Sequence, residues 1–160
     1  MTGKLISGWQ VNSIVTLQTG LPFTPQVGIN QSGTGNSSNP DRPSVNPAFT
    51  GSAIFGTRER WFDPNAFVLP TPGTFGNLGR GTLTAPGVAE VDFSLFKTTQ
   101  ISERVGLQFR AEVFNLINRA NFGSPNPVVF TGGAISSSAG VISNTATTSR
   151  QIQFGLRLAF

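Results

Sequence analysis

The sequence predicts an all-β chain in which four long antiparallel strands supply the regular structure. Three observations lead to this fold class. Apolar residues recur at every second position in four separate stretches, which is the period of a strand with two different faces. The 160 residues include 19 glycines and 11 prolines, which are typical of turns and irregular loops. The connections between the four stretches are, in order, very long, very short and long.

The composition excludes several classes of function. The net charge is +4, but only 11% of the residues are charged and the basic ones are scattered, so we expect no nucleic-acid partner. The chain has no Cys and no His, which removes disulfides, thiolate metal sites and most familiar catalytic constellations. We therefore expect no enzyme activity, no metal and no cofactor. The sequence has no apolar run long enough for a transmembrane helix, and its first residues lack the apolar core of a signal peptide.

The first strand is predicted over about residues 5–19, in the stretch GWQVNSIVTLQTG. One of its faces is mostly apolar, and the other carries mostly amides and hydroxyls. The apolar parity comprises Trp9, Val11, Ser13, Val15 and Leu17, and the polar parity comprises Gln10, Asn12, Ile14, Thr16 and Gln18.

Two further strands, over about residues 89–101 and 105–118, are predicted to form a hairpin closed by the sequence SER. In that register Leu95 lies opposite Ala111, and the apolar residues of both strands share one side of the sheet. The fourth strand is predicted over about residues 150–160, RQIQFGLRLAF, and it alternates up to a final aromatic residue.

The two long connections, over about residues 20–88 and 119–149, are predicted to be loops. Proline, glycine, serine and asparagine dominate them, and the prolines forbid long regular elements. Loops of this length are normally functional.

A membrane barrel and a soluble sheet show the same alternation of apolar and polar residues. The lengths of the loops and strands are therefore needed to distinguish them. Outer-membrane barrels have short periplasmic turns and longer extracellular loops, which matches the order of connections here. The predicted strands are also long enough to cross the hydrocarbon layer, which takes roughly 9–11 tilted residues, whereas globular strands average about five or six. The sequence therefore predicts strands of a transmembrane β-barrel with two long extracellular loops, lipid outside and water inside.

The chain resembles the C-terminal end of a TonB-dependent outer-membrane receptor, in the branch that carries an N-terminal carboxypeptidase-regulatory-like domain. The matching stretches are WFDPNAFVLPTPGTFGNLGRGTL, DFSLFKTTQISERVGLQFRAEVFNLINRANFG and RQIQFGLRLAF. The resemblance implies that residues 1–160 are a fragment, the last four antiparallel strands of a barrel of about 22, which four strands cannot close. It also implies that the parent protein lies in the bacterial outer membrane and has a signal peptide, a plug and a TonB-contacting segment that this fragment lacks.

The resemblance gives the end of the chain a role as well. Outer-membrane proteins carry a C-terminal signal that the barrel-assembly machinery reads, and the matching residues here are Gln153, Gly155, Leu158 and Phe160. The implied partners are therefore outer-membrane lipid, the barrel-assembly machinery, the TonB complex through the missing N-terminal parts, and an unknown solute.

Polar residues on the predicted lumen side are candidates for contact with the plug or with solute, although mutually paired charges in a wet interior explain them more simply. They are Gln10, Asn12, Asp92, Arg110, Glu112 and Arg157. Lys97 falls on the outward parity, near the periplasmic end, where its side chain can reach the interface. Trp9, Phe109 and Phe160 are candidates for the aromatic girdle or for ordinary lipid-facing positions.

Five residues of the longer loop are candidates for a ligand-binding surface, with plain packing of the loop as the simpler alternative. They are Arg58, Arg60, Trp61, Phe62 and Asp63.

Three functions remain open from the sequence. The first is part of an energised importer that binds a solute and passes it across the outer membrane. The second is a surface adhesion or interaction protein with a barrel anchor. The third is a soluble β-sandwich that binds a ligand.

Overall fold

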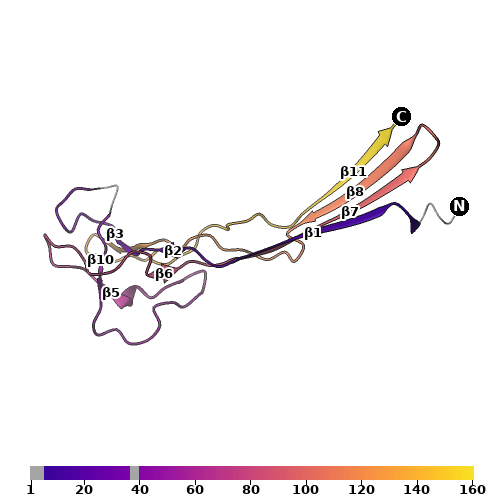
Figure 1. Cartoon of the computed structure of the whole chain (residues 1–160). Coiled ribbons are helices and arrows are strands. Elements are labelled where there is room, and N and C mark those ends of the chain that lie inside the picture. Colours follow the sequence, from indigo (N-terminus) through magenta and orange to yellow (C-terminus); the bar gives the residue numbers. More distant parts are fainter. Residues whose placement is uncertain (1–5, 37–39) are drawn as a thin grey trace. The chain divides into compact units, whose positions relative to one another are not determined.

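The structure is a computed structural model that describes residues 6–36 and 40–160 (Figure 1). The chain divides into two compact units. The sheet unit consists of residues 6–18, 88–121 and 147–160, and the loop unit consists of residues 19–87 and 122–146.

The sheet unit is one antiparallel sheet of four long strands in the order β1-β7-β8-β11 (Figure 1). Its strands are β1 (Trp9–Gln18), β7 (Val88–Gln100), β8 (Gly106–Phe114) and β11 (Gln151–Ala159). The four predicted strands are thus confirmed. The part of the first prediction at residue 5 lies outside the described residues.

Two predicted strand boundaries were too generous. β1 begins at Trp9 because Gly8 has a positive φ of 75°, and a Cβ there would lie only 2.3 Å from the carbonyl oxygen of Thr98. β8 ends at Phe114 rather than at residue 118 because Asn115 adopts a left-handed φ of 51°. Asparagine is one of the few residues that tolerate this conformation.

The predicted hairpin register is confirmed. Leu95 of β7 lies opposite Ala111 of β8, and the Ile101 N–H donates to the Val105 carbonyl at 2.8 Å. The same row continues outward to Val11 on β1 and to Phe154 on β11. Because side chains alternate along each strand, this shared register gathers the apolar parity of all four strands on one face.

The sheet does not close on itself. β1 and β11 form its two edges, and in the described part of the chain neither edge pairs with a further strand. The smallest outer-membrane barrels have eight strands, so these four strands cannot close a barrel by themselves.

The loop unit contains only short elements. They are β2 (Pro22–Phe23), β3 (Gln26–Val27), β4 (Ser44–Val45), the 3-10 helix η1 (Pro64–Ala66), β5 (Phe67–Val68), β6 (Leu83–Thr84), β9 (Val128–Thr131) and β10 (Ala134–Ile135). They pair as β10-β9-β3, β2-β6 and β4-β5. The expectation that the prolines forbid long regular elements is confirmed.

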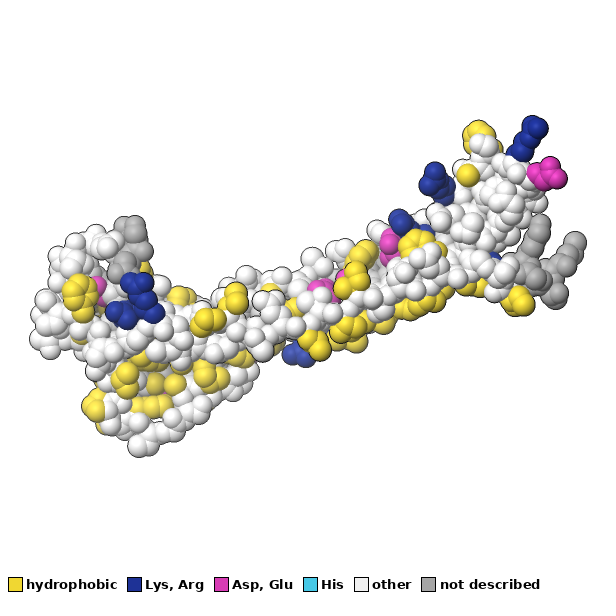
Figure 2. Space-filling model, viewed as in Figure 1, with side chains coloured by type: hydrophobic (Ala, Val, Ile, Leu, Met, Phe, Trp, Pro, Cys, Tyr) yellow, Lys and Arg dark blue, Asp and Glu magenta, His cyan; other side chains and the backbone are white. Residues whose placement is uncertain are grey.

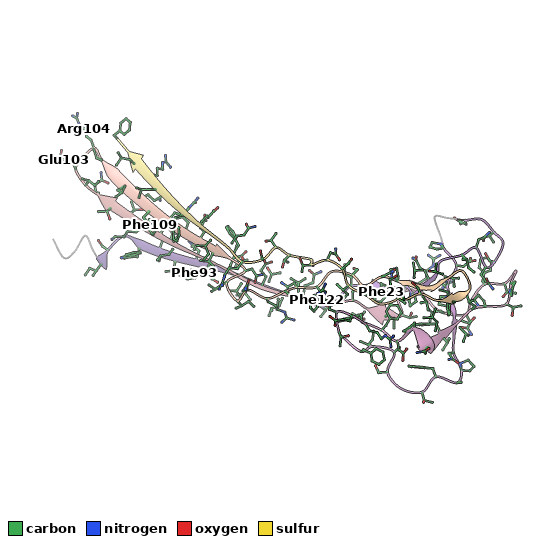
Figure 3. All side chains as sticks on the ribbon, turned by 180° about the vertical axis from the view of Figure 1, so that it is seen from behind. Phe23, Phe93, Glu103, Arg104, Phe109 and Phe122 are labelled. Atoms are coloured by element: carbon green, nitrogen blue, oxygen red, sulfur yellow. The ribbon has the colours of Figure 1, made fainter. Side chains whose placement is uncertain are left out.

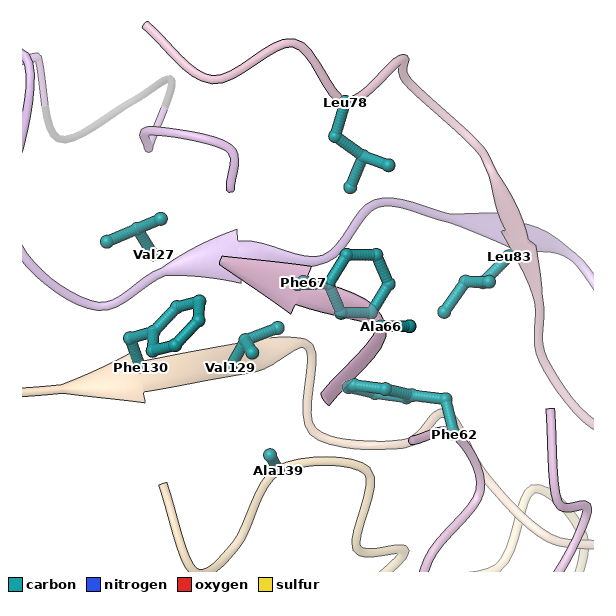
Figure 4. Close-up of a cluster of buried hydrophobic side chains, with 9 residues drawn as sticks. All are labelled: Val27, Phe62, Ala66, Phe67, Leu78, Leu83, Val129, Phe130 and Ala139. Atoms are coloured by element: carbon teal, nitrogen blue, oxygen red, sulfur yellow. The ribbon is translucent and has the colours of Figure 1, made fainter. Parts of the chain in front are cut away.

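The two long connections are not separate loops, because they fold together around one hydrophobic core (Figure 4). β3 from the first connection pairs in parallel with β9 from the second. The aromatic ring of Phe62 packs against Phe23 and Phe67, with ring centroids 5.9 and 6.0 Å away. The core consists of Val27, Phe62, Ala66, Phe67, Leu78, Leu83, Val129, Phe130 and Ala139. This core was not predicted from the sequence.

In residues 6–36 and 40–160, no helix has the length and hydropathy needed to span a bilayer.

Candidate functional site: a two-faced sheet

One face of the sheet is largely apolar, and in the described part of the chain several of its large side chains are exposed (Figure 2). Phe154 and Leu156 on β11 are 73% and 72% exposed, and Val11 and Val15 on β1 are also exposed. Figure 3 labels Phe93 and Phe109 on this sheet, and the ring of Phe109 stacks on Phe154 at 6.2 Å. Soluble proteins rarely expose apolar patches beyond a few hundred Å², so this face is built to contact an apolar environment.

The opposite face carries the six polar residues predicted to line a lumen. All six lie on the polar parity of their strands, as the register requires. Arg110 lies over the ring of Phe96 at 4.8 Å, and its Nε is 3.8 Å from Oε1 of Glu112. The Gln153 side-chain amide donates to Glu112 from the next strand, and the Gln10 amide donates to Asn12 at 3.3 Å.

These contacts link polar side chains within strands and between neighbouring strands, but the ion pair among them adds little stability. Arg110 is half exposed, and an exposed ion pair contributes only about 0–1 kcal/mol. Contact of these residues with a plug or a solute stays a prediction.

Among the described strand residues, Lys97 is the cation that lies on the outward parity. Its ammonium lies 5.2 Å from the ring centroid of Trp9 and donates to the carbonyl of Ser7, which precedes β1. Both neighbours belong to the end of the sheet that carries the hairpin turn, because Trp9 lies opposite Lys97. The lysine thus reaches polar backbone instead of resting on the apolar face.

Two buried asparagines at the other end of the strands were missed by the sequence analysis. Asn121 copies a backbone peptide, since its Oδ1 accepts from the Ala89 N–H at 3.0 Å and its Nδ2 donates to the Ala89 carbonyl at 3.1 Å. Asn115 donates from Nδ2 to the carbonyls of Arg119 and Thr148 at 2.9 and 3.0 Å.

Asp92 also takes part in these contacts of Asn115, in addition to its place on the polar face. Its carboxylate accepts the Asn115 N–H at 2.9 Å, where the backbone turns away from β8. The run NLINRAN after β8 could have indicated such a turn, because asparagine tolerates left-handed backbone and bonds to nearby backbone groups.

The comparison with protein families agrees with this two-faced sheet. A family model described as an outer membrane beta barrel domain matches residues 1–153. The chain belongs to the outer membrane β-barrel domain family. No curated protein and no solved structure matches it significantly. The membership establishes an outer-membrane barrel and excludes the soluble β-sandwich.

In this barrel wall the four residues of the predicted assembly signal lie on the edge strand or just beyond it. Gln153 and Gly155 lie opposite Glu112 and Arg110, and a Cβ at Gly155 would meet Arg110 carbons at 3.7 and 3.9 Å. Leu158 lies on the apolar face, and Phe160 is 98% exposed. Recognition of these residues by an assembly factor stays a prediction.

The five predicted ligand-contact residues of the barrel's longer loop mostly hold that loop together. Phe62 is completely buried in the core, so it offers no surface to a ligand. Trp61 donates its indole N–H to the Thr84 carbonyl at 2.8 Å, and Asp63 caps η1 by accepting the Asn65 N–H at 3.0 Å.

The two arginines of the set differ. Arg58 pairs with the second connection, because its carbonyl accepts the Ile142 N–H at 2.9 Å. The side chain of Arg60 is exposed. In the described part of the barrel, no group of three or more Asp, Glu, His or Cys side chains could hold a metal ion.

Proposed function

We propose that the chain is part of a TonB-dependent receptor that binds a solute outside the cell and imports it across the outer membrane. The observation that carries this proposal is the combination of a barrel wall with a charged inner face and two long connections folded around their own core. A receptor needs both, because the connections present a shaped surface to the solute and the charged face lines its path. The resemblance to such receptors over WFDPNAFVLPTPGTFGNLGRGTL and the hairpin stretch supports the same proposal.

The orientation follows from the lengths of the connections. The turn between β7 and β8, which carries Glu103 and Arg104 (Figure 3), is short and would face the periplasm. The loop unit would then face the outside of the cell. The apolar face would contact lipid, the free edge of β11 would be read by the barrel-assembly machinery, and other parts of the receptor would contact TonB. No nucleic-acid partner is proposed.

Solute depletion from the growth medium tests import even though the solute is not identified. We compare the wild-type bacterium, a strain that lacks this gene and a strain that lacks TonB. Import predicts at least one solute that the wild type removes and that both mutants leave behind. An unchanged depletion profile in the gene deletion, in media where the wild type expresses the protein, would overturn the proposal.

Surface adhesion is the second candidate, and one observation favours it. The loop unit exposes large apolar side chains, among them Leu21 at 66% and Phe75 at 67%, which suit contact with another macromolecule. Replacing both by serine should reduce adhesion and leave solute depletion intact if adhesion is the function. The reverse result supports import.

A further inference from the structure

The loop unit contains a pocket that none of the predicted site residues line. Its volume is about 310 Å³, at the lower end of the range of roughly 300–1,000 Å³ that is usual for small-molecule sites. Residues from four separate stretches of the described chain converge on it. They include Gln26, Gly28, Asn30, Asn36, Asp41 and Val128.

Burial and hydrogen bonds hold Asp41 in place on the acidic side of the pocket. Asp41 is only 7% exposed. Its Oδ2 accepts the Ser32 N–H at 2.6 Å, and its Oδ1 accepts the Ser32 hydroxyl at 2.8 Å. Its carbonyl accepts the Val27 N–H at 2.7 Å, which ties it to β3. A carboxylate oxygen has room for more than one hydrogen bond, so Asp41 can still accept from a ligand.

Two amides provide further polar groups. In the described part of the chain, the side-chain amide of Gln26 has no hydrogen-bond partner, and neither has Nδ2 of Asn30. Asn30 is held in place because its Oδ1 accepts the Gly35 N–H at 3.1 Å. An unpaired amide presents donors and an acceptor in one plane, which suits a hydroxyl that both donates and accepts.

The rest of the lining is apolar and carries no positive charge. Val27, Ile29, Pro40 and Val128 supply the apolar surface, and no Lys or Arg is among the described residues that line the pocket. An anion would therefore meet a carboxylate without a compensating cation, which disfavours binding. A ligand with apolar C–H surface and several hydroxyls matches both parts of the lining.

We propose that this pocket binds an uncharged, polyhydroxylated small molecule, with Asp41, Gln26 and Asn30 as its hydrogen-bonding residues. The inference deepens the proposed function and rests on it only for the fate of the ligand, because it names the class of solute that the loops capture. Binding itself requires no TonB and no import.

Titration of the purified barrel protein in detergent micelles tests the site. The uncharged probes are maltose, trehalose and myo-inositol, with gluconate as the anion and glucosamine as the cation, and saturation-transfer NMR reports binding. The variants are Gln26→Leu, which removes the amide, Gln26→Glu, which adds a charge, and Gln18→Leu as a control at an exposed glutamine on β1.

At least one uncharged probe should bind more tightly than gluconate. Gln26→Leu should weaken it roughly two- to tenfold, as expected for one lost hydrogen bond, and Gln18→Leu should leave it unchanged. The proposal is overturned if folded protein binds none of the uncharged probes, if Gln26→Leu has no effect, or if only glucosamine binds and Gln26→Glu strengthens it. Binding without import would overturn the importer alone, and import that ignores Gln26→Leu would overturn this site alone.

Discussion

An arginine at Leu95 should destabilise the assembled barrel, whereas an arginine at the neighbouring Ser94 should not. Leu95 lies in the middle of β7, in the cross-strand row with Val11 and Ala111 on the apolar face. Arg or Lys at a lipid-facing midplane position costs about 2–4 kcal/mol. Ser94 points to the other face and lies opposite Glu112. Its arginine gains a carboxylate neighbour worth about 0–1 kcal/mol.

The measurement is the free energy of unfolding by guanidinium in phospholipid vesicles, for the wild type, Leu95→Arg and Ser94→Arg. Tryptophan fluorescence can follow it, since Trp9 lies at the start of β1. We expect the two variants to differ by at least about 2 kcal/mol. Equal effects of the two substitutions, or a larger loss from Ser94→Arg, would refute the assignment of the faces.

Four further outcomes follow from the same contacts. The 160-residue chain alone should aggregate in buffer without detergent, because two strand edges and an apolar face are open; monodisperse protein that unfolds cooperatively would contradict this. Asn121→Ala should lower the free energy of unfolding by about 1–3 kcal/mol, because the N–H and the carbonyl of Ala89 both lose their hydrogen bond to the Asn121 side chain. Hydrogen exchange at the Ala89 amide should then accelerate, and unchanged exchange would contradict the role given to Asn121. Phe62→Ala should destabilise the loop unit by about 3–5 kcal/mol and make it sensitive to protease while the strands stay protected, and a protease-resistant loop unit would disprove that core. Phe160→Ala should lower the amount of protein in the outer membrane without changing the stability of the assembled protein, because the Phe160 side chain is almost fully exposed and packs against little. Equal amounts of wild type and variant in the membrane would contradict a role for Phe160 in the assembly signal.

The sheet could be predicted from the sequence because its information is local. The two faces of each strand are visible in the sequence as alternating apolar and polar residues. The short turn between β7 and β8 fixes the register of these two strands independently of distant residues. The ends of the strands were predicted less accurately, because Gly8 and Asn115 end the strands through their backbone conformation rather than through a change in hydropathy.

The loop unit could not be predicted because its core residues do not recur at regular intervals along the sequence. Phe62 and Val129 belong to different connections and meet only through the pairing of β3 with β9. An asparagine such as Asn121 also reads as a turn residue in the sequence, and only the structure shows its amide bonded to a strand. The pocket at Asp41 went unnoticed for the same reason, because its residues come together only once the two connections fold.

The environment of each face can be measured directly, because the chain has no cysteine and a nitroxide label can be placed at single positions. The labelled positions form two cross-strand rows on opposite faces, Val11, Leu95 and Phe154 in one and Asn12, Ser94 and Gln153 in the other. For the barrel in lipid bilayers, electron paramagnetic resonance should find the first row accessible to oxygen and shielded from a water-soluble nickel complex, and the second row the reverse. A first row shielded from both reagents would mean that this face is packed against protein, and the account of a lipid-facing barrel wall would be wrong.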